Sequence, residues 1–198
     1  MKTVPATPDG LDEAVAVLRA GGVVAYPTET VYGLAVDPFS EAALNRLFEV
    51  KRRDAGKPVV LIIGELGHLE RVAGCVPNQA RVYMDVFWPG PLTLLFPKSA
   101  ALPSRVTAGG DKVAVRLPSN ATAQALCRVF GGALTSTSAN ASGQTPARRV
   151  ATLDLAGIAL AIDGGLLPES LPSTLFDPVT NELLRAGAVP ESELRNAG

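Results

Sequence analysis

The sequence predicts an α/β fold in which an open, twisted sheet of mixed strand direction is flanked by helices. Short apolar runs typical of buried strands alternate with amphipathic segments of helical period along the chain. The 198 residues are 47% hydrophobic, which is enough for one sizeable core, and no shift in composition divides them. We therefore expect a single domain over residues 1–198.

The first elements are a helix, a strand and a second helix. Apolar residues from Leu11 to Leu18 recur at helical spacing, and the glycine pair 21–22 stops this helix before a buried strand at 23–26. Ser40 can cap a second helix, and the cations that begin at Lys51 lie at its C-terminal end. A strand at 59–63 follows, and then a short amphipathic segment at 66–72.

The remaining elements continue the alternation. The rigid turn at 88–91 ends a helix near 79–87, and Ser119 or Asn120 can cap another helix that ends near Phe130. Apolar runs predict strands at 92–96, 113–117, 134–135, 158–162, 173–176 and 182–185, before a small terminal helix.

Composition excludes several classes of protein. A formal net charge of −1 disfavours a nonspecific nucleic-acid binder. The N-terminus lacks the apolar stretch of a signal peptide and no run is long enough to cross a bilayer, so we expect a cytoplasmic protein with no membrane partner. Cys75 and Cys127 lack metal-ligand spacing and are expected to be reduced, with one disulfide as the alternative. With a single histidine, no metal site built by the protein is predicted, and neither familiar glycine-rich phosphate loop is present.

Three polar segments interrupt this apolar scaffold. They are the run Pro27-Thr28-Glu29-Thr30-Val31-Tyr32-Gly33, the cationic run from Lys51 to Lys57, and the run Thr135-Ser136-Thr137-Ser138-Ala139-Asn140. Each lies beside an expected strand. Together they predict a polar, positively biased site at strand ends or in the loops that follow them.

The cationic segment predicts an anion site. Lys51, Arg52, Arg53 and Lys57 place four cations within seven residues, with only Asp54 to offset them. A bound phosphate or carboxylate would relieve their mutual repulsion, and arginine is suited to bidentate oxyanion contacts. A solvated helix end is the alternative explanation of such a run.

The other two segments supply hydroxyl groups and one carboxylate. The run 135–140 leaves a buried strand and offers hydroxyl and backbone N–H groups for a phosphate or oxyanion cradle, although an ordinary turn would use the same groups. Glu29 could order Mg²⁺ through water, or could pair with Arg52 or Arg53. The residues alone therefore predict an α/β domain that binds an oxyanion.

Five ordered blocks resemble the threonylcarbamoyl-AMP synthase family of the YrdC/TsaC type, in its short single-domain form. The blocks cover nearly the whole chain: Pro27 to Leu34, Lys51-Arg52-Arg53, Trp88-Pro89-Gly90-Pro91-Leu92-Thr93, Val113 to Pro118, and Ser138-Ala139-Asn140. The resemblance implies a nucleotidyltransferase that converts ATP, L-threonine and bicarbonate to L-threonylcarbamoyladenylate and pyrophosphate, for threonylcarbamoyladenosine (t6A) modification of tRNA at position 37. It also implies a YrdC-like sheet with a concave, positively charged cavity.

The resemblance also assigns roles to matching positions. Lys51 and Arg53 would be catalytic. ATP would contact Arg53, Lys57, Ser138, Asn140 and Arg185, and threonine would contact Thr30, Arg116, Ser136 and Ser173. Mg²⁺ would accompany ATP as the cofactor. The partners would be downstream threonylcarbamoyl-transferase proteins, with tRNA itself as a further contact.

Two other functions would use the same features. A noncatalytic RNA-binding module could hold a phosphate backbone on the cationic segment, but RNA readers usually add aromatic side chains for stacking, and only 5% of this chain is aromatic. A carbamoyl-transfer domain could use the same cavity with carbamoyl phosphate as substrate. Turnover that requires threonine would separate the synthase from both.

Overall fold

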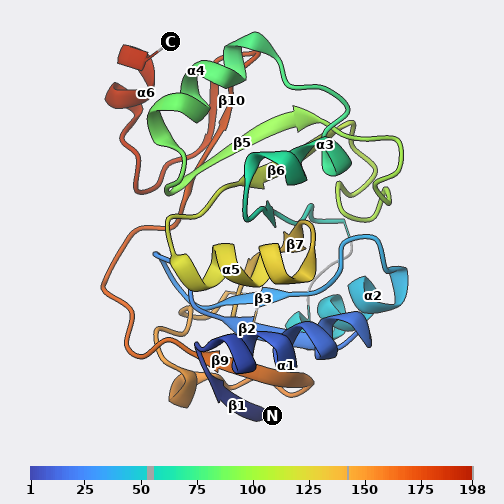
Figure 1. The fold of residues 1–198 in the computed structure, drawn as a ribbon. Helices are drawn as coiled ribbons and strands as arrows, with labels where there is room; N and C mark the ends of the chain where they lie inside the picture. Colours follow the sequence, from blue (N-terminus) through green and yellow to red (C-terminus); the bar gives the residue numbers. More distant parts are fainter. Residues whose placement is uncertain (53–55, 142, 198) are drawn as a thin grey trace.

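The strands form two mixed sheets, which lie one above the other in Figure 1. The computed structural model describes residues 1–52, 56–141 and 143–197. The strand order of the first sheet is β1 (Lys2–Pro5), β9 (Ile158–Asp163), β2 (Val23–Tyr26), β3 (Gly33–Ala35) and β8 (Thr137–Ser138). The order of the second is β11 (Glu182–Arg185), β10 (Thr174–Asp177), β5 (Leu92–Pro97), β6 (Lys112–Arg116), β4 (Leu61–Ile62) and β7 (Leu134–Thr135).

Helices flank both sheets, as the sequence predicts. They are α1 (Pro8–Arg19), α2 (Glu41–Lys51), α3 (Leu69–Val72), α4 (Asn78–Phe87), α5 (Ala121–Phe130) and α6 (Glu191–Ala197), with 3₁₀ turns η1 (Leu66–His68) and η2 (Val150–Thr152). Helix α1 packs against α5 and β9 beside the first sheet, whereas α4 packs against α6 and β5 of the second sheet (Figure 1).

Two helix starts follow the expected capping chemistry. The Ser40 hydroxyl accepts a hydrogen bond from the Ala43 N–H at 3.2 Å, and Asn120 Oδ1 accepts one from the Ala123 N–H at 3.1 Å. Helix α5 ends at Gly131, whose φ of 86° lies in the left-handed region that glycine adopts without strain. These local signals confirm the predicted bounds of α2 and α5.

The two sheets meet where the chain passes from β7 to β8. The Thr135 N–H donates to the Val36 carbonyl at 3.1 Å, next to β3 of the first sheet, while the Ser136 N–H donates to the Val60 carbonyl at 2.7 Å, next to β4 of the second. One short segment therefore belongs to both sheets. We call this region the sheet junction and define it by residues 134–140.

The sequence prediction missed three short strands. In β1 only Val4 is buried, so this strand lacks the alternation that marks a half-buried strand. Strands β3 and β8 have three and two residues and lie at the edges of the predicted polar segments. Pairing with chain distant in sequence, rather than local pattern, makes them strands: β3 pairs with both β2 and β8.

Buried apolar side chains form two clusters. The smaller lies between α1, α5 and one face of the first sheet, and it includes Leu18, Tyr26, Leu126 and Leu160. The larger includes Phe96 and Phe176 of the second sheet. Cys75 is exposed and Cys127 is buried, and both are free thiols, as expected. No described helix is both long and apolar enough to span a bilayer.

The second sheet contains an ion pair whose contribution to stability should depend on pH. Lys112 Nζ lies 2.5 Å from Asp177 Oδ2, and the Asp177 side chain is only 5% exposed. Burial acts to raise the pKa of this carboxyl group, but hydrogen bonds from Lys112 and from the Val179 and Thr180 N–H groups outweigh it and lower the pKa. A lowered folded-state pKa gives stability that is complete above the unfolded pKa and is lost as pH falls through the folded one.

We therefore expect Asp177→Asn to destabilise the protein by about 1.5–3 kcal/mol at neutral pH, and by less at about pH 3. Urea unfolding of the wild type and the variant at both pH values measures the difference. The exposed Asp12→Asn is the control and should show little effect at either pH. A destabilisation by Asp177→Asn that is equal at both pH values would contradict this assignment.

Candidate active site

The three polar segments converge on the sheet junction. The loop 27–32 joins β2 to β3, Lys51 ends α2, and residues 136–140 follow β7. Arg116 ends β6 and Ser173 immediately precedes β10, so both lie at strand ends of the second sheet. The predicted site is therefore built from elements of both sheets.

Lys51 joins the cationic segment to the third polar segment. It is only 3% exposed, and its ammonium group donates to the Ser138 carbonyl and to Asn140 Oδ1, the latter at 3.3 Å. Arg52 then turns the chain with a φ of 48°. The structure thus brings Lys51, Ser138 and Asn140 together, as the predicted ATP site requires.

The cationic segment contains two other predicted ATP contacts, Arg53 and Lys57. Arg53 lies outside the described residues. Lys57 is exposed.

Arg116 forms an ion pair with Glu29. Its Nη1 atom lies 3.3 Å from Glu29 Oε1, and the two side chains are 5% and 16% exposed. For Glu29 the sequence suggested either Mg²⁺ held through water or pairing with Arg52 or Arg53. Among the described residues its ion-pair partner is Arg116, and Arg53 lies outside them. The pairing places the carboxylate of the first polar segment next to a predicted threonine contact.

Hydroxyl groups lie at the turn of the first segment. The Thr28 hydroxyl lies 3.0 Å from that of Thr30, donates to the Val31 carbonyl at 2.7 Å, and accepts from the Thr30 N–H at 3.1 Å. Thr28 is therefore engaged in holding the loop, whereas Thr30, the predicted threonine contact, is buried at its centre with 4% exposure.

Ser136 receives a hydrogen bond from the first sheet. The Tyr26 hydroxyl donates to Ser136 Oγ at 2.7 Å. Burial raises the pKa of the Tyr26 phenol, and the hydrogen bond to Ser136 lowers it by less. The pKa therefore stays well above the usual value for tyrosine, and the phenol stays protonated. The charges of Arg116 and Glu29 also act on this pKa, with opposite signs.

Ser173 connects Arg185 to β5. The hydroxyl groups of Thr93 and Ser173 lie 2.8 Å apart, and Arg185 donates to the Ser173 carbonyl from Nε at 3.1 Å and from Nη2 at 2.9 Å. Burial and the charge of Arg116 lower the pKa of Arg185. Arg185, which is predicted to contact ATP, thus contacts Ser173, which is predicted to contact the substrate threonine.

Thr93 and Tyr26 are site residues that the sequence did not single out. Thr93 ends the Trp88–Thr93 block, so its place in that motif was the available signal. Tyr26 lies in an apolar strand and is completely buried, and nothing in its local sequence distinguishes it from a core residue.

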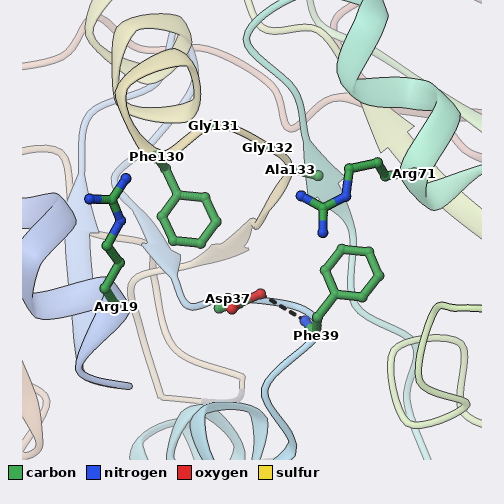
Figure 2. A pocket seen from close by; sticks show the side chains of 8 residues that line it. All are labelled: Arg19, Asp37, Phe39, Arg71, Phe130, Gly131, Gly132 and Ala133. Atoms are coloured by element: carbon green, nitrogen blue, oxygen red, sulfur yellow. Dashed lines mark hydrogen bonds between the residues drawn. The ribbon is translucent and has the colours of Figure 1, made fainter.

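The cavity drawn in Figure 2 is separate from this site. It has a volume of about 220 Å³ and is lined by Arg19, Asp37, Phe39, Arg71, Phe130, Gly131, Gly132 and Ala133. None of these residues is in the predicted site. Its glycine wall precedes β7, whereas Ser136 follows β7, so that strand separates the two regions.

Comparison with known proteins places the chain in a family. The family model for Sua5/YciO/YrdC proteins, described as telomere recombination, matches residues 16–187. A relative from Thiobacillus denitrificans, named threonylcarbamoyl-AMP synthase, is 44% identical over 173 residues, which are 86% of this chain and 92% of the relative.

Two solved structures extend the comparison. Pyrococcus abyssi Sua5, crystallised with L-threonine, superposes with a TM-score of 0.91 at 35% identity over 99% of this chain. This chain spans only 59% of that longer protein. E. coli YciO superposes with a TM-score of 0.81 at 26% identity over 96% of both chains.

Proposed function

The chain belongs to the Sua5/YciO/YrdC family, and we propose that it is a threonylcarbamoyl-AMP synthase. It would convert L-threonine, bicarbonate and ATP to L-threonylcarbamoyladenylate and pyrophosphate. One observation carries the proposal: two polar clusters, one around Lys51 and one around Arg116, lie at the same sheet junction. The relative crystallised with L-threonine supports the choice of amino acid.

The chemistry needs concentrated positive charge more than it needs a nucleophilic side chain. The amine of threonine and bicarbonate give a carbamate, one oxygen of which attacks the α-phosphorus of ATP as pyrophosphate leaves. Negative charge therefore gathers where carbamate and phosphates meet. Oriented cations stabilise such charge in the transition state, and correct positioning of two reactants can remove roughly 7–11 kcal/mol of the barrier.

We assign the two substrates to the two clusters. Lys51, with Ser138 and Asn140, is oriented for the phosphates of ATP, and Arg53 and Lys57 are assigned to the same substrate from their places in the motif. The threonine side comprises Thr30, Arg116, Ser136 and Ser173. Arg185 is assigned to ATP and donates to the carbonyl of Ser173. These roles are part of the proposal.

Magnesium would enter with ATP as part of the substrate. Among the described residues, no group of three or more His, Cys, Asp and Glu side chains is arranged to hold a metal ion. Mg²⁺ is commonly bound through substrate phosphates while it keeps several waters. We further propose that the reaction takes place in the cytoplasm and that its labile product passes to a downstream threonylcarbamoyl-transferase protein acting on tRNA.

Mass detection of the product tests the proposed reaction. Protein incubated with MgATP, L-threonine and carbon-13-labelled bicarbonate should give threonylcarbamoyladenylate that carries one label. Product formed from carbamoyl phosphate without threonine would instead indicate a carbamoyl-transfer domain. Salt-dependent tRNA binding with no adenylate formed would indicate an RNA-binding module.

A further inference from the structure

The ion pair between Glu29 and Arg116 is buried but incompletely satisfied. The atoms closest to each other, Nη1 and Oε1, are 3.3 Å apart without hydrogen-bond geometry. Within the described parts of the chain, neither Glu29 oxygen accepts a hydrogen bond, and Nε and Nη1 of Arg116 donate none. Buried charged groups are normally hydrogen-bonded, because leaving them unpaired is costly. Glu29 can therefore accept hydrogen bonds from a ligand, and Arg116 can donate hydrogen bonds to one.

The arrangement of the two charges identifies the class of ligand. An α-amino acid carries an ammonium group and a carboxylate on the same carbon, and Glu29 and Arg116 present the opposite charges side by side. The carboxylate suits the guanidinium group, which prefers planar oxyanions, and the ammonium group suits Glu29. Ser136 lies in the same site through its bond with Tyr26, and it offers a hydroxyl to the rest of the amino acid.

We propose that Glu29 is the general base that removes a proton from the ammonium group of the bound amino acid. This proposal rests on the proposed function, since it deepens the role of the same site. An ammonium group has no lone pair and cannot attack carbon, and most α-amines are protonated at neutral pH. A base within hydrogen-bond reach of such a proton typically contributes about 10² to 10⁴ in rate.

The step balances with the substrates of the proposed reaction. Glu29 takes one proton from the ammonium group and leaves a neutral amine. The amine nitrogen then forms a bond to the carbon of bicarbonate, the bond from that carbon to its hydroxyl group breaks, and a second nitrogen proton leaves with the hydroxide as water. The product is the carbamate, and protonated Glu29 returns its proton to solvent.

The groups around Glu29 are compatible with this role. Arg116, at the end of β6, faces it directly, with Nη1 3.3 Å from Glu29 Oε1. Tyr26, at the end of β2, is a protonated phenol that donates to Ser136 and so does not compete as a base. Arg185 is held by Ser173, to whose carbonyl and hydroxyl oxygens its guanidinium group donates.

Glu29→Gln tests the proposal because it keeps the shape of the side chain and removes its basicity. At about pH 7 we expect the rate of adenylate formation to fall by about 10² relative to the wild type. As the pH rises to about 9.5, above the ordinary range of α-amine pKa values, the amine loses its proton without help. The ratio of wild-type to variant rate should then shrink to below about 10. Glu49→Gln, an exposed carboxylate on α2, is the matched control and should follow the wild type at every pH.

Three outcomes would overturn the proposal. They are a normal rate for Glu29→Gln at about pH 7, a loss of the same size at every pH, and a loss in the Glu49→Gln control. If Glu29→Gln does not fold, Glu29→Asp replaces it, because its shortened carboxylate should also give a deficit that shrinks at high pH. Failure of the proposed function is distinguishable, since the wild type itself would then make no adenylate.

Discussion

Lys51→Ala is expected to lower the rate of threonylcarbamoyladenylate formation by roughly 10² to 10³, the usual cost of losing one oriented charge donor in a transition state. Lys51 is 3% exposed and its ammonium group is fixed by the Ser138 carbonyl and Asn140 Oδ1. A cation held in this way needs little reorganisation when negative charge develops on the phosphates. Pyrophosphate release at saturating substrates measures the effect, and Arg53→Ala should cause a similar loss.

Lys2→Ala is the control for the Lys51 variant. Lys2 pairs with Glu13 on the surface, with side chains 63% and 48% exposed, so its removal should change stability by only about 0–1 kcal/mol and leave the rate unchanged. Nearly normal rates in both Lys51→Ala and Arg53→Ala would show that the cationic segment does not stabilise the transition state. The assignment of this cluster to ATP would then be wrong.

Arg116→Ala is expected both to weaken the use of threonine and to destabilise the fold. It leaves Glu29 with 16% exposure and without its partner, and breaking a buried ion pair in this way typically costs about 3–5 kcal/mol. The lower end is expected here, because removal of Arg116 also relieves its repulsion of Arg185. The KM for threonine should rise while the KM for ATP changes little, since Lys51 and Asn140 are untouched.

The double variant Glu29→Ala/Arg116→Ala separates the two effects. With both charges removed, no uncompensated charge remains, so stability in urea unfolding should recover by about 1–2 kcal/mol relative to Arg116→Ala alone. The use of threonine should not recover, because both proposed contacts with its charged groups are lost. A double variant no more stable than Arg116→Ala would show that the two side chains do not interact energetically.

Local chemistry made much of the fold predictable. The caps at Ser40 and Asn120, the apolar strand 23–26 and the helix-ending turn at 88–91 are signals within a few neighbouring residues, and the structure confirms the elements they bound. The passage of residues 134–138 from one sheet to the other was not predictable in this way. It depends on hydrogen bonds to Val36 and Val60, which are about a hundred and about eighty residues earlier in the chain.

The candidate site was likewise predictable where short sequence motifs carry the signal, and not where it depends on contacts between distant parts of the chain. Motif resemblance selected Lys51, Arg116, Ser136 and Ser173, and the structure places Lys51 beside the sheet junction, Ser136 within it, and Arg116 and Ser173 at strand ends of the second sheet. The partner of Glu29 could not be deduced, because Arg116 is 87 residues away in sequence and approaches only after β6 has been placed beside β4. The sequence alone therefore did not point to Arg116.

Pyrophosphate release by the purified protein is the most direct measurement, made with MgATP and with L-threonine and bicarbonate each present or omitted. We predict release that requires both, accompanied by threonylcarbamoyladenylate in the same samples. Folded protein that releases pyrophosphate no faster when threonine is added would contradict the proposed synthase activity.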